Sequence, residues 1–327
     1  MAQGSKGKAL VTGAAGFIGS ALCSRLAADG WTVLGLDNLN EYYDVRLKQS
    51  RLQKLEGLTG FSFKEADITD RETMERLFGE FRPDVVMNLA AQAGVRYSIE
   101  NPFTYVKNNV EGFLVMLECA RRWPVRRFVY ASSSSVYGGN EKVPFSETDY
   151  VDNPVSLYAA TKISNEVMAR AYHNLYGVPA IGLRFFTVYG PWGRPDMAPM
   201  LFADAITKGR PIKVFNGGNL SRDFTYIDDI VEGIVKVLES EHTNPDRDVY
   251  NIGRGQPVNL MEFISLLEKA LGREALKEMM PMQKGDVFTT FADTSALHED
   301  FGYHPAVTLP EGIARFAEWF LSPQNPL

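Results

Sequence analysis

The chain has 327 residues, of which 45% are hydrophobic and 23% charged, a composition typical of a soluble globular protein with a sizeable core. Its formal net charge is −6 at pH 7, and its lysines and arginines form no basic stripe, which argues against nucleic acid as a partner. Two cysteines, Cys23 and Cys119, offer neither a disulfide framework nor metal-ligand spacing, and four scattered histidines form no HExxH-type pair. We therefore expect two buried thiols and no metal.

The first elements have the pattern of a nucleotide-binding strand, turn and helix. An apolar strand over residues 8–12 runs into three glycines spaced GxxGxxG from Gly13, and an apolar-periodic helix continues to about Ala28. Without Cβ atoms, these glycines let the backbone and the first N–H groups of the helix approach a pyrophosphate. A second buried strand, 32–36, ends at Asp37, whose carboxylate can accept hydrogen bonds from ribose hydroxyls and would repel a 2′-phosphate. The segment predicts a site for NAD rather than NADP.

Strand and helix patterns then alternate, which favours an α/β fold with a doubly wound, mostly parallel Rossmann sheet. The further expected strands are 61–66, 83–89, 127–131 and 180–184, with 249–252 returning to the sheet. The further expected helices lie within 38–56 and over 70–81, 102–121 and 155–176, and Asp70 is expected to cap the second of these.

After Thr187 the composition changes, because glycines and prolines divide the chain into short segments. We predict a dinucleotide-binding domain over residues 1–187, with a returning segment at about 225–253. The remainder of 188–327 is predicted to form a smaller domain over the carboxyl edge of the sheet, where such folds bind ligands. The N-terminus leads straight into the first strand and no apolar run approaches membrane-spanning length, so we expect a cytoplasmic protein without a membrane partner.

A catalytic pattern lies in the helix predicted over 155–176. Tyr158 and Lys162 are four residues apart, so their side chains share one face of the helix. A nearby ammonium group favours phenolate and lowers a tyrosine pKa, which would make Tyr158 a general base for a sugar hydroxyl. A serine run, 132–135, precedes them. Each signal occurs often by chance, but together and in this order they predict an NAD-dependent active site.

These residues together resemble the extended short-chain dehydrogenase/reductase family, specifically its nucleotide-sugar epimerases, and most closely those that act on UDP-glucuronate. The resemblance covers essentially the whole chain. The glycine loop and the YxxxK pair mark only the superfamily. More specific are residues 37–44 (DNLNEYYD), 89–98 (LAAQAGVRYS) and 183–197 (LRFFTVYGPWGRPDM).

The resemblance implies roles for individual residues. Ser133 is implied as the catalytic hydroxyl, Tyr158 as base and acid, and Lys162 as the residue that lowers the pKa of Tyr158 and binds the nicotinamide ribose. The residues implied in NAD binding, besides Tyr158 and Lys162, are Gly13, Gly16, Phe17, Ile18, Gly19, Asp37, Asn38, Asp67, Ile68, Leu89, Ala90, Ala91, Gln92 and Asn108. For Asn108 and its neighbour Asn109, a purely structural hydrogen bond is an equal alternative.

The smaller domain is implied to bind the UDP part of the substrate. Arg222 is expected against the phosphates and Asp286 near the uridine ribose. Galactose epimerases carry an arginine three residues before that aspartate, where this chain has Gln283, so one phosphate contact is replaced or missing, or Gln283 is structural.

The implied reaction is inversion at C4 of a UDP-sugar. Tyr158 takes the C4 hydroxyl proton with help from Ser133, NAD accepts the C4 hydride, and the 4-keto sugar turns to receive the hydride on its other face. In related 4,6-dehydratases and UDP-glucuronate decarboxylases, an acidic residue usually stands beside the catalytic hydroxyl. Here Ser134 and Ser135 stand there, which favours plain epimerisation.

A uronate substrate adds a constraint, because a 4-keto uronate is a β-keto acid that loses CO₂ when its C5–C6 bond stands perpendicular to the carbonyl plane. Arg194 can hold the carboxylate near that plane through two N–H bonds, unless it is a loop arginine paired with Asp196. Hydroxyl donors from Thr187, Ser134 and Ser135 can assist, and Arg96 is a weaker candidate.

We therefore predict interconversion of UDP-glucuronate and UDP-galacturonate. The alternatives are a UDP-glucose/UDP-galactose 4-epimerase, a UDP-glucuronate decarboxylase and a non-catalytic NAD-binding regulator. The resemblance also implies a homodimer, in which helices 102–121 and 155–176 of each subunit form a four-helix bundle.

Overall fold

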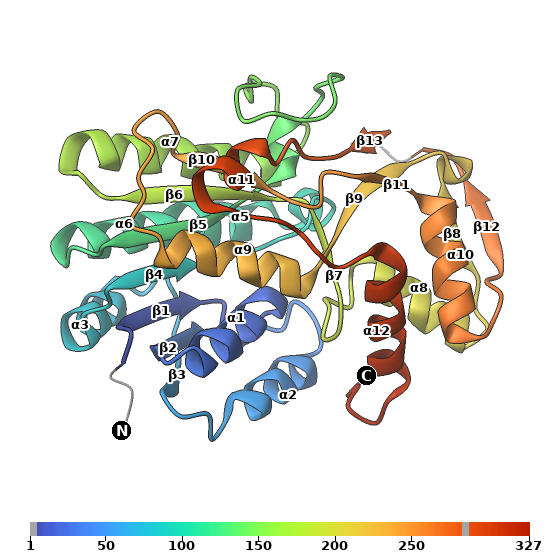
Figure 1. Ribbon diagram of the computed structural model, residues 1–327, viewed down its shortest axis with the longest axis horizontal. Helices are drawn as coiled ribbons and strands as arrows, with labels where there is room; N and C mark the ends of the chain where they lie inside the picture. The colour runs from blue at the N-terminus through green and yellow to red at the C-terminus, as the bar shows by residue number, and fades with distance from the viewer. Residues whose placement is uncertain (1–4, 283–287) are drawn as a thin grey trace.

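The computed structural model describes residues 5–282 and 288–327. Within these residues a parallel sheet of seven strands forms the centre of the molecule, in the order β10-β6-β5-β4-β1-β2-β3 (Figure 1). The strands are β1 (Lys8–Thr12), β2 (Thr32–Asp37), β3 (Phe61–Glu65), β4 (Val85–Asn88), β5 (Arg127–Ser133), β6 (Ala180–Phe185) and β10 (Val249–Ile252). The predicted fold class is confirmed, as is the return of 249–252 to the sheet beside β6.

Helices cover both faces of this sheet, because alternate strand residues point to opposite sides. In β1, Ala9 and Val11 join one buried apolar cluster and Leu10 joins another. The first face carries α1 (Phe17–Ala28), α2 (Val45–Leu55), α9 (Ile227–Glu239) and α11 (Ser295–Phe301). The second face carries α3 (Arg71–Phe81), α6 (Gly112–Arg122) and α7 (Leu157–Tyr176). The predicted cap of α3 is confirmed, because the Asp70 carboxylate accepts a hydrogen bond from the Thr73 N–H.

The helix predicted over 102–121 differs from expectation. After the short helix α4 (Tyr97–Glu100), it is built from α5 (Pro102–Tyr105), a π-helical segment (Val106–Glu111) and α6. Widened turns of this kind recur at functional sites and leave no trace in hydrophobic periodicity. The side chain of Asn165 donates to the Asn109 carbonyl at 2.6 Å, which satisfies a backbone group within the widened turn.

Asn109 itself has a structural role in this geometry. Its buried side chain accepts from the Gln92 N–H at 2.8 Å and donates to the Gln92 carbonyl at 3.0 Å. It thus fixes the segment after β4 to the π-helical turn, which favours the structural alternative for Asn109. Asn108, its neighbour, lines the main cavity described below.

A smaller part of the molecule follows the carboxyl end of β6 and lies to the right in Figure 1. One small sheet contains β7 (Thr187–Tyr189), β9 (Ser221–Tyr226), β11 (Pro257–Asn259) and β13 (Thr289–Thr290). A second pairs β8 (Ile212–Phe215) with β12 (Lys277–Met280), and the accompanying helices are α8 (Ala198–Thr207), α10 (Leu260–Leu271) and α12 (Leu309–Leu321). The domain boundaries given above stay a prediction.

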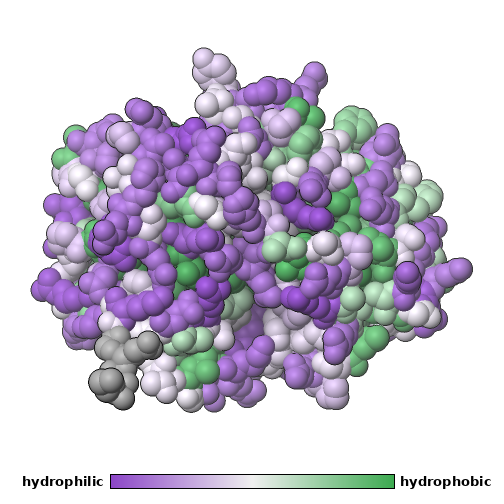
Figure 2. Space-filling view, in the orientation of Figure 1, coloured by the Kyte–Doolittle hydropathy of each residue, from purple (hydrophilic) through white to green (hydrophobic). Residues whose placement is uncertain are grey.

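The surface and the thiols agree with a globular chain. On the face shown in Figure 2, hydrophilic residues predominate and hydrophobic ones gather only in small groups. Cys23 and Cys119 are free and buried among apolar side chains, as expected. Among the described residues, no helix is long and apolar enough to cross a bilayer, and no three His, Cys, Asp or Glu side chains are grouped to hold a metal.

Candidate active site

The carboxyl ends of the central strands open into a cavity of about 400 Å³. It brings together most of the residues that the sequence predicted for the cofactor, for catalysis and for the sugar. These are Gly13, Gly16, Phe17, Ile18, Gly19, Asp37, Asn38, Asp67, Ile68, Leu89, Ala90, Ala91, Gln92, Asn108, Ser133, Ser134, Ser135, Tyr158, Lys162, Thr187 and Arg194.

The glycine loop fits a dinucleotide. A Cβ atom on Gly19 would lie 2.0 Å from the Gly13 carbonyl oxygen, so the helix can approach the loop only with glycine there. Gly13 also has a positive φ of 70°, which disfavours other residues. Within the described residues no side chain caps α1 and its first turn contains no acidic residue, so its leading N–H groups can receive a pyrophosphate.

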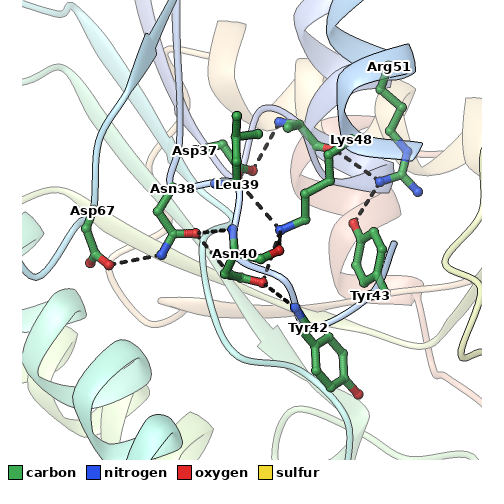
Figure 3. A network of polar contacts seen from close by, with 10 residues as sticks. Asp37, Asn38, Leu39, Asn40, Tyr42, Tyr43, Lys48, Arg51 and Asp67 are labelled. Atoms are coloured by element: carbon green, nitrogen blue, oxygen red, sulfur yellow. Dashed lines mark hydrogen bonds and ion pairs between the residues drawn. The ribbon is translucent and has the colours of Figure 1, made fainter. Parts of the chain in front are cut away.

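The end of β2 supplies the predicted carboxylate for a ribose. Asp37 is buried and accepts hydrogen bonds from the Ala15 N–H at 3.1 Å and the Leu39 N–H at 2.9 Å (Figure 3). Asn38 donates to Asp67 at 2.9 Å, which joins the segments that follow β2 and β3. Each carboxylate oxygen retains acceptor capacity for a ribose hydroxyl. The glycine loop and this carboxylate therefore fit NAD.

Arg51, which does not line the cavity but supports the segments around it, carries no signal in the sequence. It lies on α2, is 1% exposed, and donates to the Tyr43 hydroxyl at 2.8 Å (Figure 3). It also donates to the Trp192 carbonyl at 2.6 Å and the Ala15 carbonyl at 3.0 Å. Within the described residues it pairs with no carboxylate; its hydrogen-bond partners are carbonyls and a phenol. It joins the glycine loop, the segment after β2 and the segment that carries Arg194.

Lys48, one turn before Arg51 on α2, is a second residue that the sequence did not indicate. Its ammonium lies 3.9 Å from the Asp37 carboxylate and donates to the Asn40 carbonyl at 2.8 Å. Burial lowers the pKa of Lys48, and the charge of Asp37 opposes that shift. Charged residues on an amphipathic helix usually face solvent, so only the tertiary packing shows that Lys48 lines the cavity and that Arg51 is buried.

Tyr158 and Lys162 share a face of α7 as predicted, but the Lys162 ammonium group is directed to β5 and not to the Tyr158 phenol. The Lys162 Nζ donates to the Ala131 carbonyl at 2.7 Å and lies 5.9 Å from the centre of the Tyr158 ring. Burial raises the pKa of Tyr158, while a hydrogen bond with Ser133 and the charge of Arg194 lower it. The expected lowering by Lys162 is therefore not met in this geometry, because its long stem carries the ammonium to β5.

The pKa of Lys162 depends on its burial and on groups outside the cavity lining. Burial lowers the pKa of Lys162 to about 8, and the charge of Glu166, one turn further along α7, opposes the shift. Glu166 forms a buried two-bond pair with Arg184 at 2.9 and 2.8 Å and accepts from the Ser132 hydroxyl at 2.5 Å. Sequence reasoning missed Glu166 and Arg184, although Glu166 continues the four-residue spacing of Tyr158 and Lys162.

Arg194 lines the cavity and also forms the loop ion pair that was its alternative interpretation. Its Nε and Nη2 atoms donate to the two Asp196 oxygens at 3.0 and 2.5 Å. The Tyr42 hydroxyl donates to Asp196 at 3.1 Å. Arg194 lowers the pKa of Tyr158, and the presence of Tyr158 contributes to a raised Arg194 pKa. The guanidinium therefore lies within electrostatic range of the phenol.

A smaller recess of about 200 Å³ adjoins the cavity and shares Ser134, Ser135 and Thr187 with it. Arg222 lines this recess and donates to the Ser221 carbonyl at 2.9 Å. Asp286 and Gln283 lie outside the described residues. Arg96 lies outside the cavity lining, with its guanidinium 5.4 Å from the centre of the Phe215 ring, and its role stays a prediction.

Comparison with known proteins places the chain in a family. Residues 9–253 match the NAD dependent epimerase/dehydratase family. UDP-glucuronate 4-epimerase 2 of Arabidopsis thaliana is 46% identical, over 95% of this chain and 75% of that protein. UDP-glucuronic acid 4-epimerase from Bacillus cereus, solved in complex with UDP-glucuronic acid and NAD, is 36% identical with a TM-score of 0.87, over 95% of this chain and 98% of that one.

A neighbour with another substrate is nearly as similar. UDP-glucose 4-epimerase from Thermotoga maritima, solved with UDP-glucose, is 33% identical with a TM-score of 0.87, over 96% of this chain and 98% of that one. The family match spans most of the chain, and the structural likeness spans nearly all of it. The chain therefore belongs to the NAD dependent epimerase/dehydratase family.

Proposed function

We propose that this protein is an NAD-dependent UDP-glucuronate 4-epimerase, which interconverts UDP-glucuronate and UDP-galacturonate. The observation that carries the proposal is the presence of Tyr158 and Arg194 in one cavity, close enough for each to influence the other's ionisation. A general base for a C4 hydroxyl and a cation for a C6 carboxylate thus face the same ligand. The two UDP-glucuronate 4-epimerases compared above support this substrate.

In this proposal Tyr158, once ionised, takes the proton of the C4 hydroxyl, and the same oxygen later returns it. NAD supplies the hydride acceptor and, on the opposite face of the turned sugar, the hydride donor. Ser133 bonds to Tyr158 and lowers its pKa, so it stabilises the basic form. The protein contributes orientation, electrostatics and exclusion of water, which are the terms a fold can supply to a cofactor reaction.

The 4-keto uronate must be protected from loss of CO₂ while the enzyme holds it. Arg194 is proposed to keep the carboxylate near the plane of the ketone, helped by the hydroxyls of Ser134, Ser135 and Thr187, which line the same cavity. The serines occupy the place where a decarboxylase or dehydratase would use an acid. Arg222, in the adjoining recess, is proposed to bind the diphosphate.

A homodimer and a cytoplasmic location complete the proposal. Large apolar side chains on the two long helices are exposed, including Phe103 at 84%, Val167 at 64% and Leu175 at 70%, which supports pairing through these helices. Two free, buried thiols fit a reducing compartment.

Incubation of the purified protein with UDP-glucuronate, without added NAD, tests the function. Chromatography and proton NMR should find a mixture of UDP-glucuronate and UDP-galacturonate. A UDP-pentose as the main product would instead identify a decarboxylase. Absence of any conversion, with or without added NAD, would refute both activities on UDP-glucuronate and favour a neutral sugar substrate or a regulator.

UDP-glucose is the second candidate substrate. The ion pair between Arg194 and Asp196 satisfies the guanidinium without a substrate carboxylate, so the cavity can also accept a neutral sugar. The Thermotoga maritima neighbour supports this alternative. Parallel assays with UDP-glucose and UDP-glucuronate on the native protein and on Arg194→Ala distinguish them, because loss of the guanidinium should lower turnover of the uronate further than turnover of UDP-glucose.

A further inference from the structure

The guanidinium of Arg194 already binds a carboxylate of the protein itself. Its Nε and Nη2 atoms, which form one edge of the guanidinium, donate to Asp196 Oδ1 and Oδ2. This is the two-bond arrangement by which arginine grips a carboxylate most strongly. Asp196 stands two residues after Arg194 in the segment before α8, so the pair is local and the Asp196 carboxylate stays close to the guanidinium.

Asp196 is in turn held from the other side of the cavity. The Tyr42 hydroxyl donates to Asp196 Oδ2, and the Arg194 guanidinium lies 5.9 Å from the centre of the Tyr42 ring. Burial and the neighbouring Asp196 charge raise the pKa of Tyr42 to about 12, so the phenol remains a proton donor at neutral pH. Three side chains from two distant segments therefore form one charge-balanced group beside the reacting centre.

We propose that Asp196 competes with the substrate carboxylate for Arg194 and so keeps the hold on a uronate weak enough for the sugar to turn. This inference rests on the proposed function and concerns how the same site discriminates and releases its substrate. Asp196 lies outside the cavity lining and acts through Arg194, so it is a positioning residue.

C4 inversion places two opposite demands on the residue that holds the carboxylate. The carboxylate must be held while the 4-keto sugar faces one way, released as the ring turns, and held again. A guanidinium with no other partner would bind the carboxylate strongly and would be left half-buried and unpaired during each release, which is unfavourable. With Asp196 in place, the guanidinium is never without a counter-charge, so release is easier. Binding that must be broken during turnover lowers KM without raising kcat.

The test is Asp196→Asn, which removes the charge and keeps the shape. With UDP-glucuronate, KM should fall about three- to tenfold because the substrate no longer competes, and kcat should fall at least as much because release is harder. The inhibition constant of UDP-glucose, which has no carboxylate, should stay within about twofold of the native value. A KM that rises or stays unchanged would overturn the competition.

Two further variants test the interpretation, one as a second probe and one as a control. Tyr42→Phe removes only the hydroxyl bond to Asp196. It should shift KM and kcat for UDP-glucuronate in the same direction as Asp196→Asn, by a smaller factor. If Asp196→Asn does not fold, the direction of the shift in Tyr42→Phe decides whether the competition holds. Asp204→Asn breaks an ion pair with Lys208 on the surface of α8 and should leave both constants within about twofold. Equal shifts in all three variants would contradict the proposal.

Assays of the native protein distinguish failure of this inference from failure of the proposed function. If it does not convert UDP-glucuronate, the proposed function fails. If it does, and Asp196→Asn leaves the ratio of uronate KM to the UDP-glucose inhibition constant unchanged, only the competition fails.

Discussion

Tyr158 is a weak acid buried next to two groups that favour its ionised form, Ser133 and Arg194. Burial acts in the opposite direction and is the largest influence, so the pKa of Tyr158 in the substrate-free protein is raised. A base works only when ionised, so kcat/KM should rise with pH through the pKa of Tyr158. The hydroxyl of Ser133 and the guanidinium of Arg194 each offset part of the rise that burial imposes on the pKa of Tyr158.

Ser133→Ala should move that rising limb to higher pH, because the lost hydrogen bond stabilised phenolate. We expect kcat/KM for UDP-glucuronate to fall about 10²–10³-fold at neutral pH, and by less only where the pH exceeds the pKa of Tyr158 in the native enzyme. Ser133→Thr keeps the hydroxyl and should keep the limb close to its native position. A pH profile of Ser133→Ala that is lowered uniformly, with no shift, would contradict this role.

At the scale of the element, α7 carries three functional side chains at four-residue intervals. Tyr158 faces the cavity, Lys162 reaches the carboxyl end of β5, and Glu166 binds Arg184 on β6. The helix is thus fixed to two strands by buried polar contacts. The orientation of the catalytic face depends on a charge pair that is itself out of reach of the substrate.

Removal of either partner of this buried pair leaves an uncompensated charge. Glu166→Gln and Arg184→Met should each lower the free energy of unfolding by about 3–5 kcal/mol, whereas the double variant should lose clearly less than the sum. Urea unfolding followed by circular dichroism measures all three. Additive losses would show that the pair is not coupled.

The exposed face of the two long helices gives a second prediction at this scale. Phe103→Glu combined with Val167→Glu should turn a dimer into a monomer in size-exclusion chromatography with light scattering, because a charge is expensive to bury in an apolar interface. Tyr150→Glu alters a side chain that is equally exposed, at 85%, but lies in a loop, and should leave the mass unchanged. A native protein that already runs as a monomer would refute the dimer.

Features of the fold and the site could be predicted from the sequence where the residues that determine them lie close together in the chain. The glycine loop, Asp37, the Asp70 cap and the Tyr158–Lys162 spacing depend on neighbours within a few positions, and the structure has these features as expected. The π-helical turn depends on Asn165, which is 56 positions from Asn109. The direction of the Lys162 ammonium depends on Ala131, and the burial of Arg51 on Trp192; long-range packing of this kind has no sequence periodicity.

At the scale of the whole molecule, Arg51 connects the parallel sheet to the segment that carries Arg194. Arg51→Met should lower the free energy of unfolding by about 2–4 kcal/mol, because several buried carbonyls lose a charged donor. It should also reduce the NAD that remains bound through purification, since Ala15 belongs to the glycine loop. Arg46→Met, on the exposed side of the same helix, should alter neither stability nor bound NAD. Retention of full NAD content in Arg51→Met would contradict the connecting role.

The connection by Arg51 also has a consequence for the order of events during synthesis. Its carbonyl partner on Trp192 lies 141 positions later in the chain. At about 5–20 residues per second, the ribosome needs roughly 7–28 seconds to add that stretch. Until Trp192 has been added, the segment that carries it cannot cover the glycine loop, and the Arg51 guanidinium of the nascent chain remains in water. Stable capture of the dinucleotide therefore has to wait until the chain has been made past Trp192, in its second half.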